Sequence, residues 1–244
     1  MAGFGIIALF LIVVFFRSKP IRSPSRSSLF LNQQVQNVTL TQATLTLLRD
    51  WSYMNLLICF GIVIGSFYSI STLLNQMLEI QQYSSNTTSL VGTILVVVGI
   101  FGAYIFGWLA DKTRAYKLLL IICVFGTMIS MVFFTLVFDK MNSVLLCIAG
   151  GMLGFFLTAL LPLCMDISVE ISFPLPEAIV CNLLLLSAQV FGIILISACT
   201  PLMAHVGVEW VNYTTIIILA ISCVLILLFN GKNKRLNAEE QSTN

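Results

Sequence analysis

Apolar runs long enough to cross a lipid bilayer recur along this chain, and they constrain its fold more than any other feature. A helix needs about 20 apolar residues to cross a hydrocarbon core roughly 30 Å thick. With 59% hydrophobic residues and a mean hydropathy of +1.02, the chain has more apolar side chain than a soluble domain of 244 residues can bury. The runs are continuous rather than alternating, which argues against a β-barrel. We therefore expect an all-α polytopic membrane protein.

We place seven spans in the sequence. They cover residues 2–16, 53–77, 90–110, 118–138, 143–165, 178–202 and 213–229. The first is short, and its positive charges, Arg17 and Lys19, come after it. A signal peptide would have its charges before the apolar core. The pattern therefore favours a helix that runs from outside to inside and is cut at its beginning.

Positive charge predicts the orientation. All but one of the twelve Lys and Arg residues fall on the same side of seven alternating spans, and Lys140 is the exception. Because positive loops face the cytoplasm, we expect the N-terminus outside and the C-terminus inside. The sequon at Asn86 then lies outside and should be glycosylated, whereas Asn37 lies inside. Asn212 lies outside but close to the membrane.

Residue types that would indicate an enzyme or a cofactor are not arranged in a recognisable pattern. The seven cysteines lie in or at the ends of apolar runs without a C-x-x-C pair, and His205 is the single histidine. We interpret the cysteines as buried, inert thiols. We expect neither enzymatic activity nor a metal or other cofactor. The net charge of +2 is too small to indicate nucleic-acid binding.

Polar side chains enter two of the predicted spans. Tyr68, Thr72, Asn75 and Gln76 gather on one side of a helix at 3.6 residues per turn, and Gln189 lies in the middle of another apolar run. One interpretation is interhelical hydrogen bonding, at about 1 kcal/mol for each bond. The other is a site for a polar solute, with the tyrosine ring facing a cation. The pattern alone does not separate the two.

Glycines accompany the same apolar runs and favour close helix packing. They are Gly99, Gly102, Gly107, Gly150, Gly151 and Gly154. Gly107 opens the charged stretch GWLADKTRAYK, which we interpret as a loop between two spans.

This stretch resembles the loop motif G-x-x-x-D-[KR]-x-[RK] of the major facilitator superfamily. Three further stretches resemble the feline leukaemia virus subgroup C receptor family, solute carrier family 49. They are FFRSKP, GSFYSISTLLNQM and GFFLTALLPLCMDISVEISFPLPEAIVCNLLLLSAQVFG. The resemblance implies a sixth helix at residues 1–17, a cytoplasmic linker at 18–52, a C-terminal six-helix half at 53–230 and a cytoplasmic tail at 231–244. It also implies a missing N-terminal half, from a partial sequence or a true half-transporter.

The resemblance implies facilitated transport of choline or ethanolamine by alternating access. Tyr68 and Gln189 match substrate-contacting positions of the family, and Thr72, Asn75 and Gln76 extend the same polar band. The implied gating residues are Gly107, Asp111, Arg114, Asp166 and Glu170. Asp166 stands where the family usually has a glutamate, while Glu170 matches the family.

Two alternatives remain open: a haem transporter, working in export or import, and a non-transporting membrane receptor or adaptor. The expected partners are a small-molecule substrate, the lipid bilayer and the missing half. We expect a plasma-membrane protein, with a mitochondrial or other internal membrane as the alternative.

Overall fold

A computed structural model describes residues 40–229, and within this range every regular element is a helix. The helices are α3 (Leu40–Arg49), α4 (Trp51–Ile80), α5 (Ser85–Thr113), α6 (Tyr116–Phe138), α7 (Ser143–Ser172), α8 (Glu177–His205) and α9 (Val208–Leu228). Six of them, α4 to α9, are long and apolar enough to cross a membrane. Six of the seven predicted spans are thereby confirmed as helices. The first span, most of the linker and the tail lie outside the described residues.

Polar residues cap the starts of three helices, and two of these helices, α4 and α5, begin before the predicted spans. Asp50 begins α4 by accepting a hydrogen bond from the Ser52 amide, and Ser84 begins α5 by accepting one from the Thr87 amide. Asn142 begins α7 in the same way, with Oδ1 accepting from the amides of residues 144 and 145. Such caps satisfy amides at a helix end that have no partner within the helix.

The end of the predicted linker contains a helix. Residues 40–49 form α3, and the side chains of Ala43 and Leu47 are buried. These two residues are spaced i and i+4, which is the period of an amphipathic helix, whereas Leu40 at its start is exposed. The sequence prediction missed this period because it covers only about one turn.

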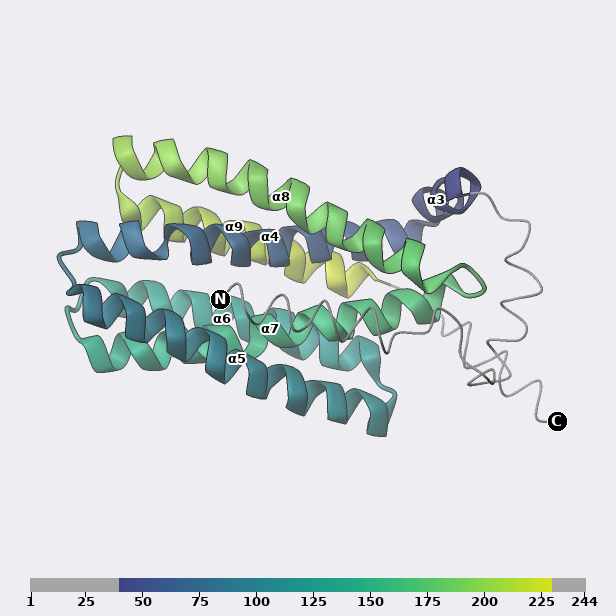
Figure 1. Ribbon diagram of the computed structural model, residues 1–244, viewed down its shortest axis with the longest axis horizontal. Helices are drawn as coiled ribbons and strands as arrows, with labels where there is room; N and C mark the ends of the chain where they lie inside the picture. The colour runs from purple at the N-terminus through teal and green to yellow at the C-terminus, as the bar shows by residue number, and fades with distance from the viewer. Residues whose placement is uncertain (1–39, 230–244) are drawn as a thin grey trace, which may run out of the picture. The chain divides into compact units, whose positions relative to one another are not determined.

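The six long helices alternate in direction across the bundle. The connections at residues 81–84, 139–142 and 206–207 lie together at one end, which we call the Asn86 end (Figure 1). The connections at residues 114–115 and 173–176 lie at the opposite end, which we call the Arg114 end. This alternation is what successive membrane crossings require.

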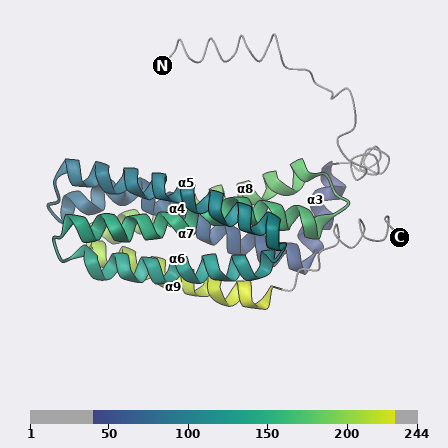
Figure 2. The same ribbon diagram turned by 90° about the horizontal axis from the view of Figure 1, so that it is seen from below.

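The helices pack in pairs. α5 has its most extensive contact with α7, and α4 has its most extensive contact with α8; α6 and α9 pack against each other and against these pairs. Two views of the bundle show α4, α5 and α8 on one side and α6 and α9 on the other (Figures 1 and 2). The two faces of the bundle are therefore formed by different helices.

Glycines set the separation within the α5–α7 pair. A Cβ added to Gly102 would overlap the carbonyl oxygen of Phe155, and one added to Gly154 would overlap that of Leu95. A Cβ on Gly99 would overlap the Thr158 hydroxyl. These three positions confirm the predicted close packing, in which backbone approaches backbone.

Substitution of alanine at two glycines of α5 tests this packing. Gly102→Ala should destabilise the bundle, because overpacking costs about 1–3 kcal/mol and the obstructing atom belongs to the backbone of α7. The matched control is Gly107→Ala on the same helix, where nothing lies within 4 Å of an added Cβ. It should leave stability unchanged or raise it slightly, since alanine favours a helix over glycine by about 1 kcal/mol. The measurement is the thermal unfolding temperature in detergent, and equal effects of the two changes would contradict the assigned interface.

Candidate functional site

The polar band predicted on one side of a helix occupies one face of α4. Thr72, Asn75 and Gln76 are exposed, and Tyr68 is half-buried one turn nearer the middle of the helix. Leu73 and Leu74, which point the other way, are buried. The described residues therefore do not bury these polar groups between helices of the bundle. An exposed polar face on a membrane-spanning helix needs a water-filled path or a further partner.

This face lies next to the crossing of α4 and α8. A Cβ added to Gly65 would come within 2.8 Å of the Gly192 amide nitrogen, so the two backbones nearly touch. Tyr68 lies beside the same crossing, with its Cδ2 atom 3.1 Å from the position of an added Gly192 Cβ. Its ring centroid lies 6.0 Å from that of Phe67. The close crossing thus places a partly exposed aromatic ring against the backbone of α8.

Gln189 is exposed on α8, three residues before Gly192. It therefore lies within about one helical turn of the segment that contacts Tyr68. The structure brings the two predicted substrate-binding helices together at this level. Thr72, Asn75 and Gln76 continue from Tyr68 along α4 toward the Asn86 end.

Two hydrogen bonds that hold α8 against α4 were missed from the sequence. The Tyr53 hydroxyl donates to the Val180 carbonyl at 2.7 Å. The Ser187 hydroxyl is shared between the Leu184 carbonyl of its own helix, at 2.7 Å, and the Leu57 carbonyl of α4, at 3.1 Å. Both bonds between the two helices join residues more than 120 positions apart in the chain. Tyrosine is common near membrane boundaries and serine is common within membrane helices, so the sequence contained no signal that distinguished these two.

The side-chain amides that are buried inside the bundle are not those of the polar face of α4. Asn55 on α4 and Asn212 on α9 are 5% and 1% exposed. Both amide atoms of Asn212, and Oδ1 of Asn55, have no hydrogen-bond partner among the described residues. Burial of this extent makes Asn212 inaccessible as a glycan acceptor, whereas Asn86 is exposed in the first turn of α5.

The charged residues predicted to form a gate lie at the Arg114 end. Tyr116, at the start of α6, interacts electrostatically with Asp166, Glu170, Asp111 and Arg114. Asp111 also interacts with Asp166 across the space between α5 and α7. The fold therefore gathers these four predicted gating residues around Tyr116, which the sequence analysis did not select. Asp111, Arg114 and Asp166 are exposed, and Glu170 is buried.

Two details of the predicted gate are different in the structure. Most of the stretch predicted as a loop is helix, because α5 continues through Thr113. Arg114 then adopts a left-handed backbone conformation, with φ of 52°. Arg114 therefore lies just after the last turn of α5 rather than within the helix. Likewise no described helix crosses close to Gly107, so the close approach expected there is not made within residues 40–229.

The connection at the Asn86 end is fixed by a buried tyrosine. The Tyr83 hydroxyl donates to the Phe138 carbonyl at 3.1 Å, which ties the α4–α5 connection to the end of α6. Burial raises the pKa of Tyr83, and the nearby Asp139 carboxylate raises it further. Gln81 donates to Asp139 across the same space at 3.2 Å.

The cysteine side chains lie mostly in the core, and those in the described residues do not form a metal site. Six of the seven cysteines are buried, and Cys181 is half-buried. The Cys59 thiol lies 3.6 Å from the Ser222 carbonyl, and the Cys223 thiol lies 3.7 Å from Met128 Sδ. Among the described residues, no group of three His, Cys, Asp or Glu side chains could hold a metal ion.

Comparison with known proteins gives a family match and several relatives. The family model described as Major Facilitator Superfamily matches residues 1–171. The chain is 36% identical over 188 residues to the choline/ethanolamine transporter FLVCR1 of Felis catus, covering 76% of this chain and 33% of that protein. It is 34% identical over 220 residues to the uncharacterized MFS-type transporter C09D4.1 of Caenorhabditis elegans, covering 89% and 37%.

A third relative is the choline/ethanolamine transporter FLVCR2 of Homo sapiens. It is 29% identical over 245 residues, which cover 99% of this chain and 46% of that protein. The chain therefore spans between a third and a half of the length of these three relatives.

Glycosylation tests the predicted orientation of the bundle. Asn86→Gln should abolish the mobility shift that a glycosidase produces on electrophoresis, because Asn86 is exposed at the end predicted to face outside. Asn212→Gln is the matched control and should leave the shift intact, since Asn212 is buried. A shift that depends on Asn37 would reverse the predicted topology.

Proposed function

Because the chain belongs to the major facilitator superfamily, and its relatives fit the feline leukaemia virus subgroup C receptor family, we propose that it forms the C-terminal half of a choline or ethanolamine transporter. The substrate would cross by facilitated alternating access. The observation that supports this most is the exposed polar face of α4, with Tyr68 held at the α4–α8 crossing. The substrate class comes from the names of two relatives, which are choline/ethanolamine transporters.

The chemistry of this face suits a small organic cation. A quaternary ammonium group has diffuse charge and no N–H donor, so an aromatic face attracts it better than a hydrogen-bond acceptor does. The half-buried ring of Tyr68 can supply that face. The exposed amides of Asn75, Gln76 and Gln189, with the Thr72 hydroxyl, can orient the hydroxyl group of choline or ethanolamine.

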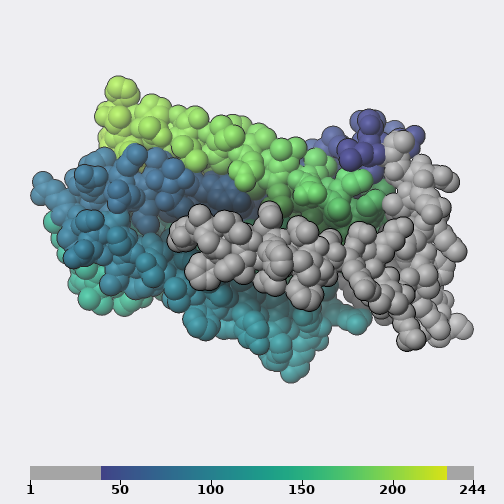
Figure 3. Space-filling view, in the orientation of Figure 1, coloured from purple at the N-terminus to yellow at the C-terminus, as the bar shows by residue number. Residues whose placement is uncertain are grey.

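The site needs walls that the described bundle lacks. Only 28% of the residues in the most apolar 18-residue stretch of α5, and likewise of α8, are buried in the bundle. The corresponding share for α4, which lies between them, is 72%. The space-filling view shows the surfaces of α8 and α5 on the same side as α4 (Figure 3). A second six-helix half packed on α5 and α8 would enclose the polar face, and rocking of the halves would expose it alternately to each side.

The charges at the Arg114 end suit the role of a gate in this mechanism. Asp111 and Arg114 are exposed at the end of α5, the helix that would contact the second half. Ionic contacts made there in one state and broken in the other would control access from that side. Asp166, Glu170 and Tyr116 form the surrounding charged and polar group.

Haem is the less favoured substrate, and the role of a non-transporting receptor or adaptor has no specific support. The reported relatives with an assigned substrate are named for choline and ethanolamine. His205 is exposed at the Asn86 end rather than on the polar face of α4.

Substitution of Tyr68 tests the proposed site in the complete twelve-helix protein. Tyr68→Phe should keep most choline uptake, because the ring face remains. Tyr68→Ala should lose about 1–2 kcal/mol of binding, which corresponds to roughly five- to thirtyfold in affinity. Tyr213→Ala is the matched control, a half-exposed tyrosine on α9, and should leave uptake unchanged. If Tyr68→Phe and Tyr68→Ala behave alike, the aromatic site is wrong; haem uptake measured in parallel tests the alternative substrate.

Substitution of Asp111 tests the proposed gate. Asp111→Asn should slow choline turnover and leave the amount of protein at the membrane unchanged, because the side chain is exposed and outside the core. Asp139→Asn, an exposed carboxylate at the opposite end, is the control and should have normal turnover. Unchanged turnover in Asp111→Asn would leave this residue with a role in topology only.

A further inference from the structure

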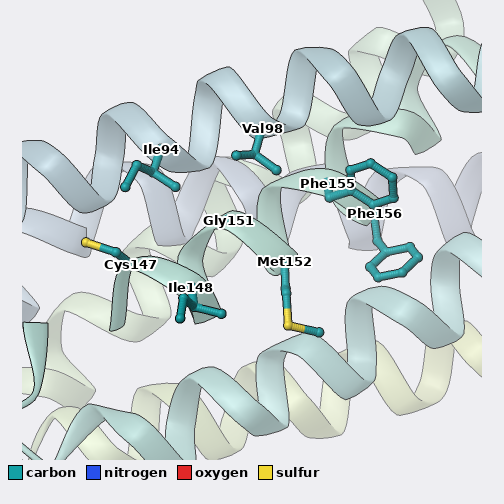
Figure 4. Close-up of a pocket in the computed structure, with 8 residues that line it drawn as sticks. All are labelled: Ile94, Val98, Cys147, Ile148, Gly151, Met152, Phe155 and Phe156. Carbon is teal, nitrogen blue, oxygen red and sulfur yellow. The ribbon is translucent and has the colours of Figure 1, made fainter. Parts of the chain in front are cut away.

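An apolar groove runs along the contact between α5 and α7, in the half of the bundle nearer the Asn86 end. It has a volume of about 380 Å³. Ile94 and Val98 of α5 form one wall, and Ile148, Met152 and Phe156 of α7 form the other (Figure 4). Gly151 forms part of the floor, where the absence of a side chain lets Ile94 pack directly against α7. The volume lies within the range of about 300–1,000 Å³ that small-molecule sites occupy.

The groove is separate from the proposed transport site. Gly92 of α5 faces α4, since an added Cβ would lie 3.9 Å from Leu74 Cδ2. Ile94 follows two residues later, and at about 100° per residue it points to nearly the opposite side of the helix. On α7, Phe156 packs against Gly126 of α6. The groove therefore opens away from the polar face of α4, on the α6 side of the bundle.

The groove meets a second hollow toward the Asn86 end, which is mainly apolar but has three polar side chains in its lining. This second hollow has a volume of about 440 Å³ and shares the lining residue Cys147 with the groove. Its polar lining residues are Asn86 and Thr87 of α5 and Ser143 of α7. The hydroxyl oxygens of Thr87 and Ser143 lie 3.4 Å apart across the two helices, and that of Thr87 is also 2.9 Å from the Ser84 hydroxyl. A hydroxyl has one donor and two acceptor sites, so this pair can still bond a further hydroxyl group. None of the described residues that line either space is charged.

The length of the combined groove matches one leaflet of a bilayer. From Ser143 to Phe156, at 1.5 Å per residue, it extends about 20 Å along α7. Half of a hydrocarbon core about 30 Å thick is about 15 Å, and the polar end would then lie in the interfacial region. The exposed side chains of Ile148 and Met152 would contact lipid in any case.

We propose that this groove is a binding site for a membrane sterol, with its hydroxyl group at Thr87 and Ser143 and its ring system along Ile94, Val98 and Met152. A sterol has a long apolar body and a single uncharged hydroxyl, which is the distribution of polarity along the groove. A phospholipid has a phosphate that basic side chains would bind, and the described lining contains none. The site is independent of the proposed transport function.

Photolabelling of the full chain in cell membranes tests the site. The probe is a clickable cholesterol analogue with a diazirine in its ring system, and labelled peptides are identified by mass spectrometry. Label should concentrate on the groove segments of α5 and α7, and excess unlabelled cholesterol should displace it. Ser143→Ala, which removes an exposed hydroxyl, should weaken this competition by about two- to tenfold, the range expected for one hydrogen bond.

A groove-filling variant with a matched control provides the second measurement. Ile148→Trp should abolish labelling of the groove, and Ile221→Trp should not; both residues are 50% exposed isoleucines on membrane helices, but Ile221 lies on α9. Equal labelling of Ile148→Trp and the wild type would overturn the proposal. So would groove labelling by a diazirine phosphatidylcholine probe that excess cholesterol fails to displace, or groove contacts cross-linked between two copies of the chain. Ser143→Ala keeps the test decisive if the tryptophan variant folds poorly.

Discussion

The close approach of helix backbones at glycines determines how this bundle is assembled. Within a bilayer, apolar side chains gain little by leaving lipid, so association depends on packing contacts and hydrogen bonds between helices. Gly102 and Gly154 bring the backbones of α5 and α7 together, and Gly65 and Gly192 do the same for α4 and α8. Once these two pairs are formed, the sides of α4, α5, α7 and α8 that lie outside the contacts have fixed orientations.

The α4–α8 pair determines which polar groups are available for function. Because α4 meets α8 at Gly65, its neighbour Tyr68 is placed at the edge of the contact rather than inside it. Thr72, Asn75 and Gln76 continue this edge and remain exposed. The Tyr53 and Ser187 hydrogen bonds hold the pair nearer the Arg114 end. The same crossing therefore provides both the stability of the pair and the position of the proposed substrate site.

The α5–α7 pair has a comparable consequence on the other side of the bundle. Its glycines lie on the facing surfaces of the two helices, and the bulkier Ile94, Val98 and Phe156 stand beside them. Because the two helices are this close and larger side chains lie beside the contact, a groove remains that is open to the lipid. The proposed transport face and the proposed sterol groove thus arise from one packing principle applied on two sides.

The sequence by itself determined the number, approximate limits and alternating order of the membrane helices in residues 40–229, because long apolar runs have one stable solution in lipid. It also selected the polar face of α4, since 3.6-residue periodicity is a local property. Only the tertiary structure decided which polar residues are buried, as the contrast between buried Asn212 and exposed Asn75 demonstrates. It alone placed Tyr116 among the charges of the Arg114 end and left Gly107 without a close neighbour in the described chain. Such choices depend on which helices meet and at what depth, and that is set by contacts between residues far apart in the chain.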